Sequence, residues 1–177
     1  MAYQKLQVSD GLAVITSADV NIPDPSTVVV LDTATGATVG VAAFTASTLT
    51  DAGTKFTEAG ILPGAIVYNT TAGIAGQAYN VVSVDSDTVL TISPATAGGA
   101  NDSYTIYNKE TIGCILYVGG TGDLKVKMAA HKGNTSTAAE PANSKITFKG
   151  LPNASFLPIQ VVGVDSTSTA TDILALW

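Results

Sequence analysis

Residues 113–128 read Gly-Cys-Ile-Leu-Tyr-Val-Gly-Gly-Thr-Gly-Asp-Leu-Lys-Val-Lys-Met. The apolar run 114–118 and the run 124–128 each have the length and composition of a β-strand. Between them, Gly-Gly-Thr-Gly predicts a hairpin turn. The glycines superficially resemble a phosphate-binding loop, but they join two strands and open no helix, so they lack the helix dipole that would hold an anion.

Similar runs occur along the whole chain. Short β-branched segments are separated by Gly, Asn, Asp and Pro about every ten residues, as in sandwiches and barrels, and no window predicts more than one helical turn, within 51–59. Four or five such strands follow one another between residues 42 and 108. We therefore predict an all-β fold, in which a discontinuous, jelly-roll-like β-sandwich body (1–41 and 109–177) is interrupted by a small β-barrel-like lobe (42–108) that projects outward.

Composition narrows the class of function. Charged residues make up only 12% of the chain, and a thinly charged surface favours assembly with other surfaces. The net charge is −6 and all eight cationic residues are lysines, whereas nucleic-acid sites rely on clustered cations and especially on arginine. The apolar runs are too short to span a bilayer, and we expect no signal peptide at the start of the chain. We expect neither a nucleic-acid nor a membrane partner.

Few side chains suit catalysis or metal binding. Cys114 lies in an apolar run and is expected to be a buried hydrophobe, and His131 lies in a loop of small residues and is expected to be solvated. A zinc site needs at least three His or Cys ligands, and the chain has two such residues. Asp85 and Asp87 offer oxygen ligands for Ca²⁺, although Asp-Ser-Asp is also ordinary turn chemistry, so a calcium site stays open. We predict no catalytic residue, no cofactor and no enzyme activity.

Four tyrosines of the predicted lobe are candidates for facing a ligand: Tyr68, Tyr79, Tyr104 and Tyr107. A sugar-binding platform needs coplanar, exposed rings. Tyrosines spaced along strands more often pack at the edge of a core and hydrogen-bond through the hydroxyl. A glycan-binding adhesion module that uses the lobe is therefore the alternative function.

The C-terminal residues 173–177 read Ile-Leu-Ala-Leu-Trp and end on the only tryptophan. Chain ends fray unless tertiary structure holds them. An end as apolar as this predicts a strand that packs into the fold or forms a subunit contact. We therefore predict Leu174, Leu176 and Trp177 as interface residues, and we expect Trp177 to be at least half buried.

One family resemblance follows from the order of several segments. They are the strand–glycine–strand segment 113–124, Ile-Thr-Phe-Lys-Gly-Leu-Pro at 146–152, Phe-Leu-Pro-Ile-Gln-Val at 156–161, and Thr-Ala-Thr-Asp-Ile-Leu-Ala-Leu-Trp at 169–177. Together with the opening Met-Ala-Tyr-Gln-Lys-Leu-Gln-Val, this order resembles a family of small virion proteins of tailed phages, related to the head-spike base proteins of gene transfer agents and common in marine phages. The long, Thr/Ala-rich connection between Met128 and Ile146 departs from the short turn of that family.

The resemblance implies a non-enzymatic component of the head exterior, either a capsid decoration or cement protein or the base of a head spike. Its implied partners are further copies of itself, with a trimer favoured over a pentamer and the number of copies left open, and the major capsid protein or other head proteins. Assembly in the reducing cytoplasm of a host suits a chain with one unpaired cysteine.

Overall fold

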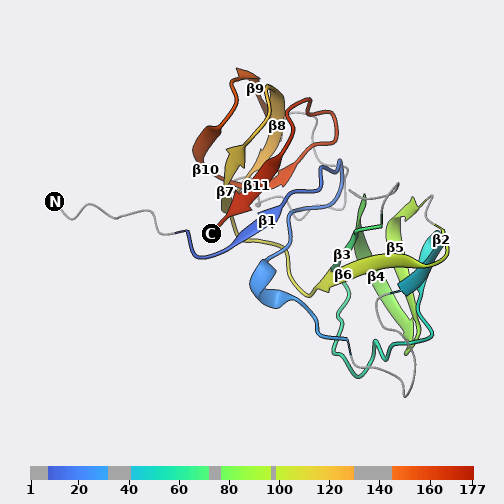
Figure 1. The fold of residues 1–177 in the computed structure, drawn as a ribbon. Coiled ribbons are helices and arrows are strands. Elements are labelled where there is room, and N and C mark those ends of the chain that lie inside the picture. The colour runs from blue at the N-terminus through green and yellow to red at the C-terminus, as the bar shows by residue number, and fades with distance from the viewer. Residues whose placement is uncertain (1–7, 32–40, 72–76, 97–98, 130–144) are drawn as a thin grey trace.

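The computed structural model describes residues 8–31, 41–71, 77–96, 99–129 and 145–177. Figure 1 shows two β-sheet units, a body that contains the C-terminus and a lobe beside it. The described residues form eleven strands and one short 3-10 helix, with no α-helix. The predicted all-β class is confirmed.

The body is a six-stranded antiparallel sheet in the order β1-β11-β7-β10-β8-β9. The first half of β10 pairs with β7 and its second half pairs with β8, with shifts of register on both sides of Val161. The sheet therefore folds over, and buried side chains from both halves share one core, in keeping with a β-sandwich. Its strands are β1 (Gly11–Ala13), β7 (Cys114–Val118), β8 (Gly122–Met128), β9 (Lys145–Leu151), β10 (Ser155–Val164) and β11 (Ile173–Leu176).

The Gly-Gly-Thr-Gly segment is not the predicted hairpin turn, because β7 and β8 each pair with β10 and not with each other. It turns a corner against residues 169–172, where the Gly120 N–H donates to the Thr171 carbonyl at 3.0 Å. A Cβ on Gly120 would lie 2.0 Å from Thr171 Oγ1, and one on Gly122, which has a φ of +149°, would lie 2.5 Å from the Ala170 nitrogen. The glycines are needed because two backbones approach closely here.

The lobe is a closed five-stranded barrel in the order β2-β5-β4-β3-β6. Its strands run from residue 41 to residue 107, compared with the range 42–108 expected for the lobe. Phe44 and Phe56 are the largest fully buried side chains, and they pack inside the barrel. The strands are β2 (Val41–Thr50), β3 (Ile66–Asn69), β4 (Gln77–Ser86), β5 (Val89–Thr96) and β6 (Asp102–Tyr107).

An N-terminal segment, residues 14–31, which we call the arm, runs from the body to the barrel (Figure 1). It contains the 3-10 helix η1 (Pro25–Thr27). On the body side, the Ser17 N–H donates to the Val164 carbonyl at 2.8 Å. On the barrel side, the Val29 N–H donates to the Ile106 carbonyl at 2.8 Å. The arm therefore uses its backbone to join the two units.

Candidate interaction surface

The outer surface of the body sheet carries a cluster of apolar side chains. Tyr117 in β7 lies directly opposite Leu174 of β11 on one side and Phe156 of β10 on the other, so these three side chains form a row across three strands. Leu176 lies opposite Ile115 in the next row. The rings of Tyr117 and Phe156 are 5.0 Å apart between centroids, and Phe156 and Leu174 are 60% and 39% exposed. We call these five residues the outer apolar face.

The strands beneath this face are apolar on both sides. In β7, Cys114, Leu116 and Val118 point into the body core, whereas Ile115 and Tyr117 between them point outward. A strand with one solvated face normally alternates apolar and polar residues, and a continuous apolar run is typical of a strand covered on both faces. Within the described residues only the inner side of β7 is fully covered, so the outer apolar face has the composition of a surface that packs against another protein.

Trp177 lies on the inner side of the sheet and not on the outer apolar face. It packs against the body core, less than half of its surface is exposed, and its indole Nε1–H donates to Thr111 Oγ1 at 2.9 Å. Its backbone N–H donates to the Asp10 carbonyl at 3.1 Å, and its own carbonyl accepts from the Ser9 N–H at 2.6 Å. The expected burial of Trp177 is confirmed. Of the three predicted interface residues, Leu174 and Leu176 share the outer apolar face.

The four tyrosines of the lobe are all buried, each less than 10% exposed, so the prediction that they face a ligand is wrong. Tyr79 and Tyr104 point into the barrel core. Tyr68 and Tyr107 point outward from the barrel, where their rings meet edge to face at 5.7 Å between centroids and pack against Val20 of the arm. The arm thus covers the side of the barrel that would otherwise present aromatic rings to a glycan.

The hydroxyls of these tyrosines differ in their partners. The Tyr104 hydroxyl donates to Asp51 Oδ2 at 2.8 Å, and both burial and this neighbouring carboxylate raise the pKa of Tyr104. Burial also raises the pKa of Tyr68; the nearby Ile15 backbone lowers it by less, and the hydroxyl makes no hydrogen bond of good geometry with the described residues. Both groups stay protonated at neutral pH and are structural.

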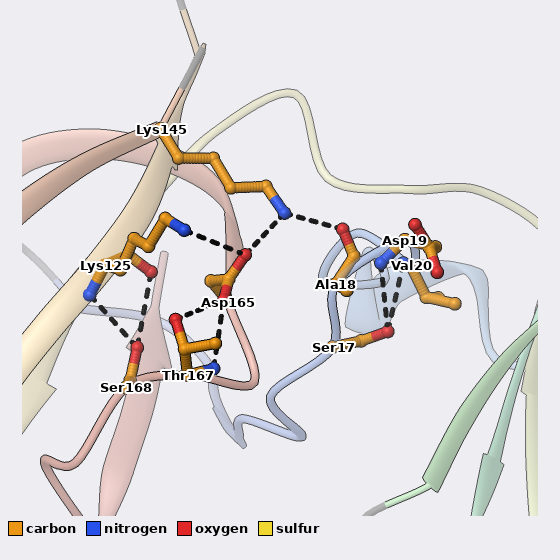
Figure 2. Close-up of polar contacts among 9 residues, drawn as sticks. All are labelled: Ser17, Ala18, Asp19, Val20, Lys125, Lys145, Asp165, Thr167 and Ser168. Carbon is orange, nitrogen blue, oxygen red and sulfur yellow. Dashed lines mark hydrogen bonds and ion pairs between the residues drawn. The ribbon is translucent and has the colours of Figure 1, made fainter. Parts of the chain in front are cut away.

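A charged cluster around Asp165 ties the arm to the body (Figure 2). Asp165 is 4% exposed, and its Oδ2 accepts from Lys145 Nζ at 2.6 Å and lies 3.8 Å from Lys125 Nζ. Its Oδ1 accepts from the backbone N–H and the hydroxyl of Thr167 at 2.9 and 2.6 Å. Lys145 Nζ also donates to the Ala18 carbonyl of the arm at 2.6 Å.

Burial alone would raise the pKa of Asp165. The hydrogen bonds from Lys145 and Thr167, together with the positive charge of Lys145, outweigh burial and hold the pKa well below its usual range. Asp165 is therefore ionised at neutral pH, and its carboxylate is engaged by groups of the protein itself. Sequence reasoning missed this cluster, because its members come from β8, β9, the arm and the segment after β10, with no local motif.

A cavity of about 240 Å³ lies beside this cluster, where the arm, β4 and β5 meet. Its volume is below the roughly 300–1,000 Å³ that is typical of small-molecule sites. The polar side chains in its lining are those of Thr16, Ser17, Asp19, Gln77, Tyr79 and Ser166. The Ser17 hydroxyl oxygen accepts from the Val20 N–H at 3.1 Å, which fixes the turn of the arm. The cavity lies where the arm, the barrel and the body meet.

Three further candidate residues from the sequence are Cys114, Asp85 and His131. The first two are held by contacts within the fold. Burial raises the pKa of the Cys114 thiol to about 12, and Sγ donates to the Val161 carbonyl at 3.4 Å, so the expectation of a buried hydrophobe is confirmed. The Asp85 carboxylate accepts from the hydroxyls of Thr91 and Ser83 at 2.6 and 2.7 Å, and these bonds lower its pKa. His131 lies outside the described residues.

In the ranges of the chain that the structure describes, no three His, Cys, Asp or Glu side chains come close enough to hold a metal ion. Among the same residues there is no helix of the length and apolarity needed to cross a membrane. Comparisons with protein-family models, with curated proteins and with solved structures find no match for this chain.

Proposed function

We propose that this chain is a non-enzymatic structural protein of a phage virion, which decorates or cements the exterior of the capsid or forms the base of a head spike. The observation that carries this proposal is the outer apolar face. A contiguous exposed apolar patch of a few hundred Å² is often a functional contact site. The order of segments that resembles small head proteins of tailed phages supplies the setting, with the major capsid protein or other head proteins and further copies of the chain as partners.

The use of polar groups supports a structural role. Asp165, Asp51 and Asp102 are buried, and each carboxylate accepts a hydrogen bond from a neighbouring group of the same chain. Catalytic carboxylates instead face a site that a substrate can enter. These buried acids therefore stabilise the fold, which suits a protein whose task is to hold its shape in an assembly.

The arrangement of the two units suits docking by one and display by the other. The barrel packs against the arm through Tyr68 and Tyr107, and these contacts leave the outer apolar face of the body uncovered. The body can therefore dock while the barrel projects from the capsid. Assembly takes place in the host cytoplasm, and neither nucleic acid nor a membrane takes part.

Co-expression with the shell-forming protein encoded in the same genome, followed by electron cryomicroscopy of the particles, tests this proposal. We expect density for the body on the outer surface of the shell. Phe156→Lys places a charge in the outer apolar face and should remove that density. The matched control is Val82→Lys, because Val82 is 53% exposed on barrel strand β4 and should tolerate the same change. Bare shells with the natural chain, or equal decoration by Phe156→Lys, would contradict the proposal.

A further inference from the structure

We infer that the outer apolar face binds the same face of a second copy, so that two chains pair about a two-fold axis. The face cannot contact a second copy and the shell at the same time, so the pair is a state of the free chain that docking on the shell replaces. The biological role of this exchange rests on the proposed function. The face is defined above by residues of three adjacent strands: Ile115, Tyr117, Phe156, Leu174 and Leu176.

The shape of the face suits packing of sheet against sheet. Directly opposed side chains on neighbouring strands have Cβ atoms about 5 Å apart, so the row from Leu174 through Tyr117 to Phe156 spans about 10 Å. The neighbouring edge strand β1 places Gly11 opposite Leu176 and Ala13 opposite Leu174. These small exposed residues leave room for a second sheet, which would pack about 10 Å away with interdigitating side chains.

The chemistry of the face requires an apolar partner. β7 and β11 are hydrogen-bonded to a neighbouring strand on both sides, so neither has a free backbone edge with which a partner strand could pair. The face contains no charged residue, and its one polar group is the Tyr117 hydroxyl. A copy of the same face satisfies this requirement, because it brings apolar groups opposite apolar groups and buries no unpaired charge.

The area of the face matches the centre of an ordinary pair. From the exposed fractions of Phe156 and Leu174 and the partial exposure of the other three side chains, the face presents about 240–390 Å² of surface, most of it apolar. A standard interface buries about 800 Å² on each partner, of which about 500 Å² is apolar. The face supplies most of that apolar centre, so we expect a reversible pair with a Kd on the order of micromolar.

Symmetry and charge distinguish this pair from other assemblies. A patch that contacts itself gives a closed isologous pair, whereas a trimer, the state expected from the resemblance, needs the face to meet a different surface. Exposed Asp10 precedes β1 and exposed Asp172 precedes β11, so acids of the two copies lie at the rim of the pair. Salt screens their repulsion, and pairing should therefore tighten as ionic strength rises.

Sedimentation of the full chain from about 1 to about 100 µM tests the inference. We expect the mass to rise from one chain of 17.9 kDa towards two chains, with tighter pairing at higher salt. Phe156→Lys, and separately Leu174→Lys, should remain single chains throughout, whereas Val82→Lys should pair like the natural chain. Thermal unfolding of each variant confirms that it is folded. A single-chain natural protein, a mass of three or five chains, or pairing by folded Phe156→Lys would overturn the inference.

Shell binding measured on the same samples separates this inference from the proposed function. If the natural chain pairs in solution and leaves shells bare, the proposed function fails and the pairing stands. If it decorates shells as a single chain at every concentration, the pairing fails and the proposed function stands.

Discussion

Asp165→Asn is a sensitive test of how the arm is held, because it removes one charge with little change of shape. In the natural chain the carboxylate accepts from Lys145 Nζ at 2.6 Å and from two groups of Thr167. An asparagine can accept through one oxygen only. Either its amide nitrogen faces Lys145, where donor meets donor, or the bonds to Thr167 are lost.

The size of the effect follows from burial. Removing one partner of a fully buried ion pair costs about 3–5 kcal/mol. The side chain of Lys145 is 17% exposed and that of Lys125 is 34% exposed, so water can solvate both lysines in part. We therefore expect Asp165→Asn to lower the free energy of unfolding by about 2–3 kcal/mol, which corresponds to a fall in Tm of about 5–10 °C for a protein of this size.

Thermal unfolding followed by circular dichroism measures this change. The matched control is Glu58→Gln, which removes the exposed pair of Lys55 and Glu58 at 3.0 Å and should change Tm by about 1 °C or less. A folded Asp165→Asn variant whose Tm falls no further than that of the control would refute the reasoning.

The pH dependence gives a second signature of Asp165. Its pKa is lowered in the folded chain, so the stability that its charge contributes is complete above the unfolded value of about 3.9. That contribution is lost as the pH falls through about 3.9 toward the folded pKa. The difference in Tm between the natural chain and Asp165→Asn should be constant from about pH 5 to 8 and should narrow below about pH 4. A difference that widens on acidification would contradict the assignment.

Three further predictions concern other parts of the fold. Tyr104→Phe removes one hydrogen-bond donor from the buried Asp51 carboxylate, whose Oδ1 still accepts from the Gly53 N–H, and should lower the free energy of unfolding by about 1–3 kcal/mol. Tyr68→Phe removes a hydroxyl without a good partner and should change the free energy of unfolding by less than about 0.5 kcal/mol. Urea titration compares the two variants, and equal losses would contradict the account. The Cys114 thiol, with its raised pKa, should react with a thiol reagent at pH 8 only after unfolding, and rapid labelling of the folded chain would oppose its placement in the core. Deleting residues 173–177 removes a strand between β1 and β7 and should prevent folding; a soluble product with the natural circular dichroism spectrum would disprove that role.

The fold class could be predicted because strand signals are local. Runs such as 114–118 and 173–177 are apolar at successive positions, and turn residues separate them. The apolar character of 173–177 also predicts Leu174 and Leu176 as contact residues, because successive side chains of a strand point to opposite faces and cannot all reach one core. The burial pattern of β7 adds that one side of this sheet is only partly covered within the described chain.

The remaining features depend on contacts between distant parts of the chain, which local patterns do not encode. Lys145 and Ala18, joined by a hydrogen bond, are 127 residues apart in sequence. The glycine segment after β7 has the composition of a hairpin turn. It is not one, because β10 lies between the two strands that it connects. The sequence alone leaves the lobe tyrosines as candidate ligand groups. It does not show that the arm covers Tyr68 and Tyr107.

The chain enters and leaves the barrel at one place, since Val28 of the arm forms an antiparallel bridge with Tyr107, the last residue of the last barrel strand. An insertion whose two ends are adjacent can in principle be exchanged like a cassette, because the host domain needs only a short bridge in its place. Here the barrel also buries part of the arm, because Tyr68 and Tyr107 pack against Val20. Any module grafted in its place must bring an apolar patch that fits Val20 and its neighbours, whereas the side of the barrel away from the arm is free to diversify.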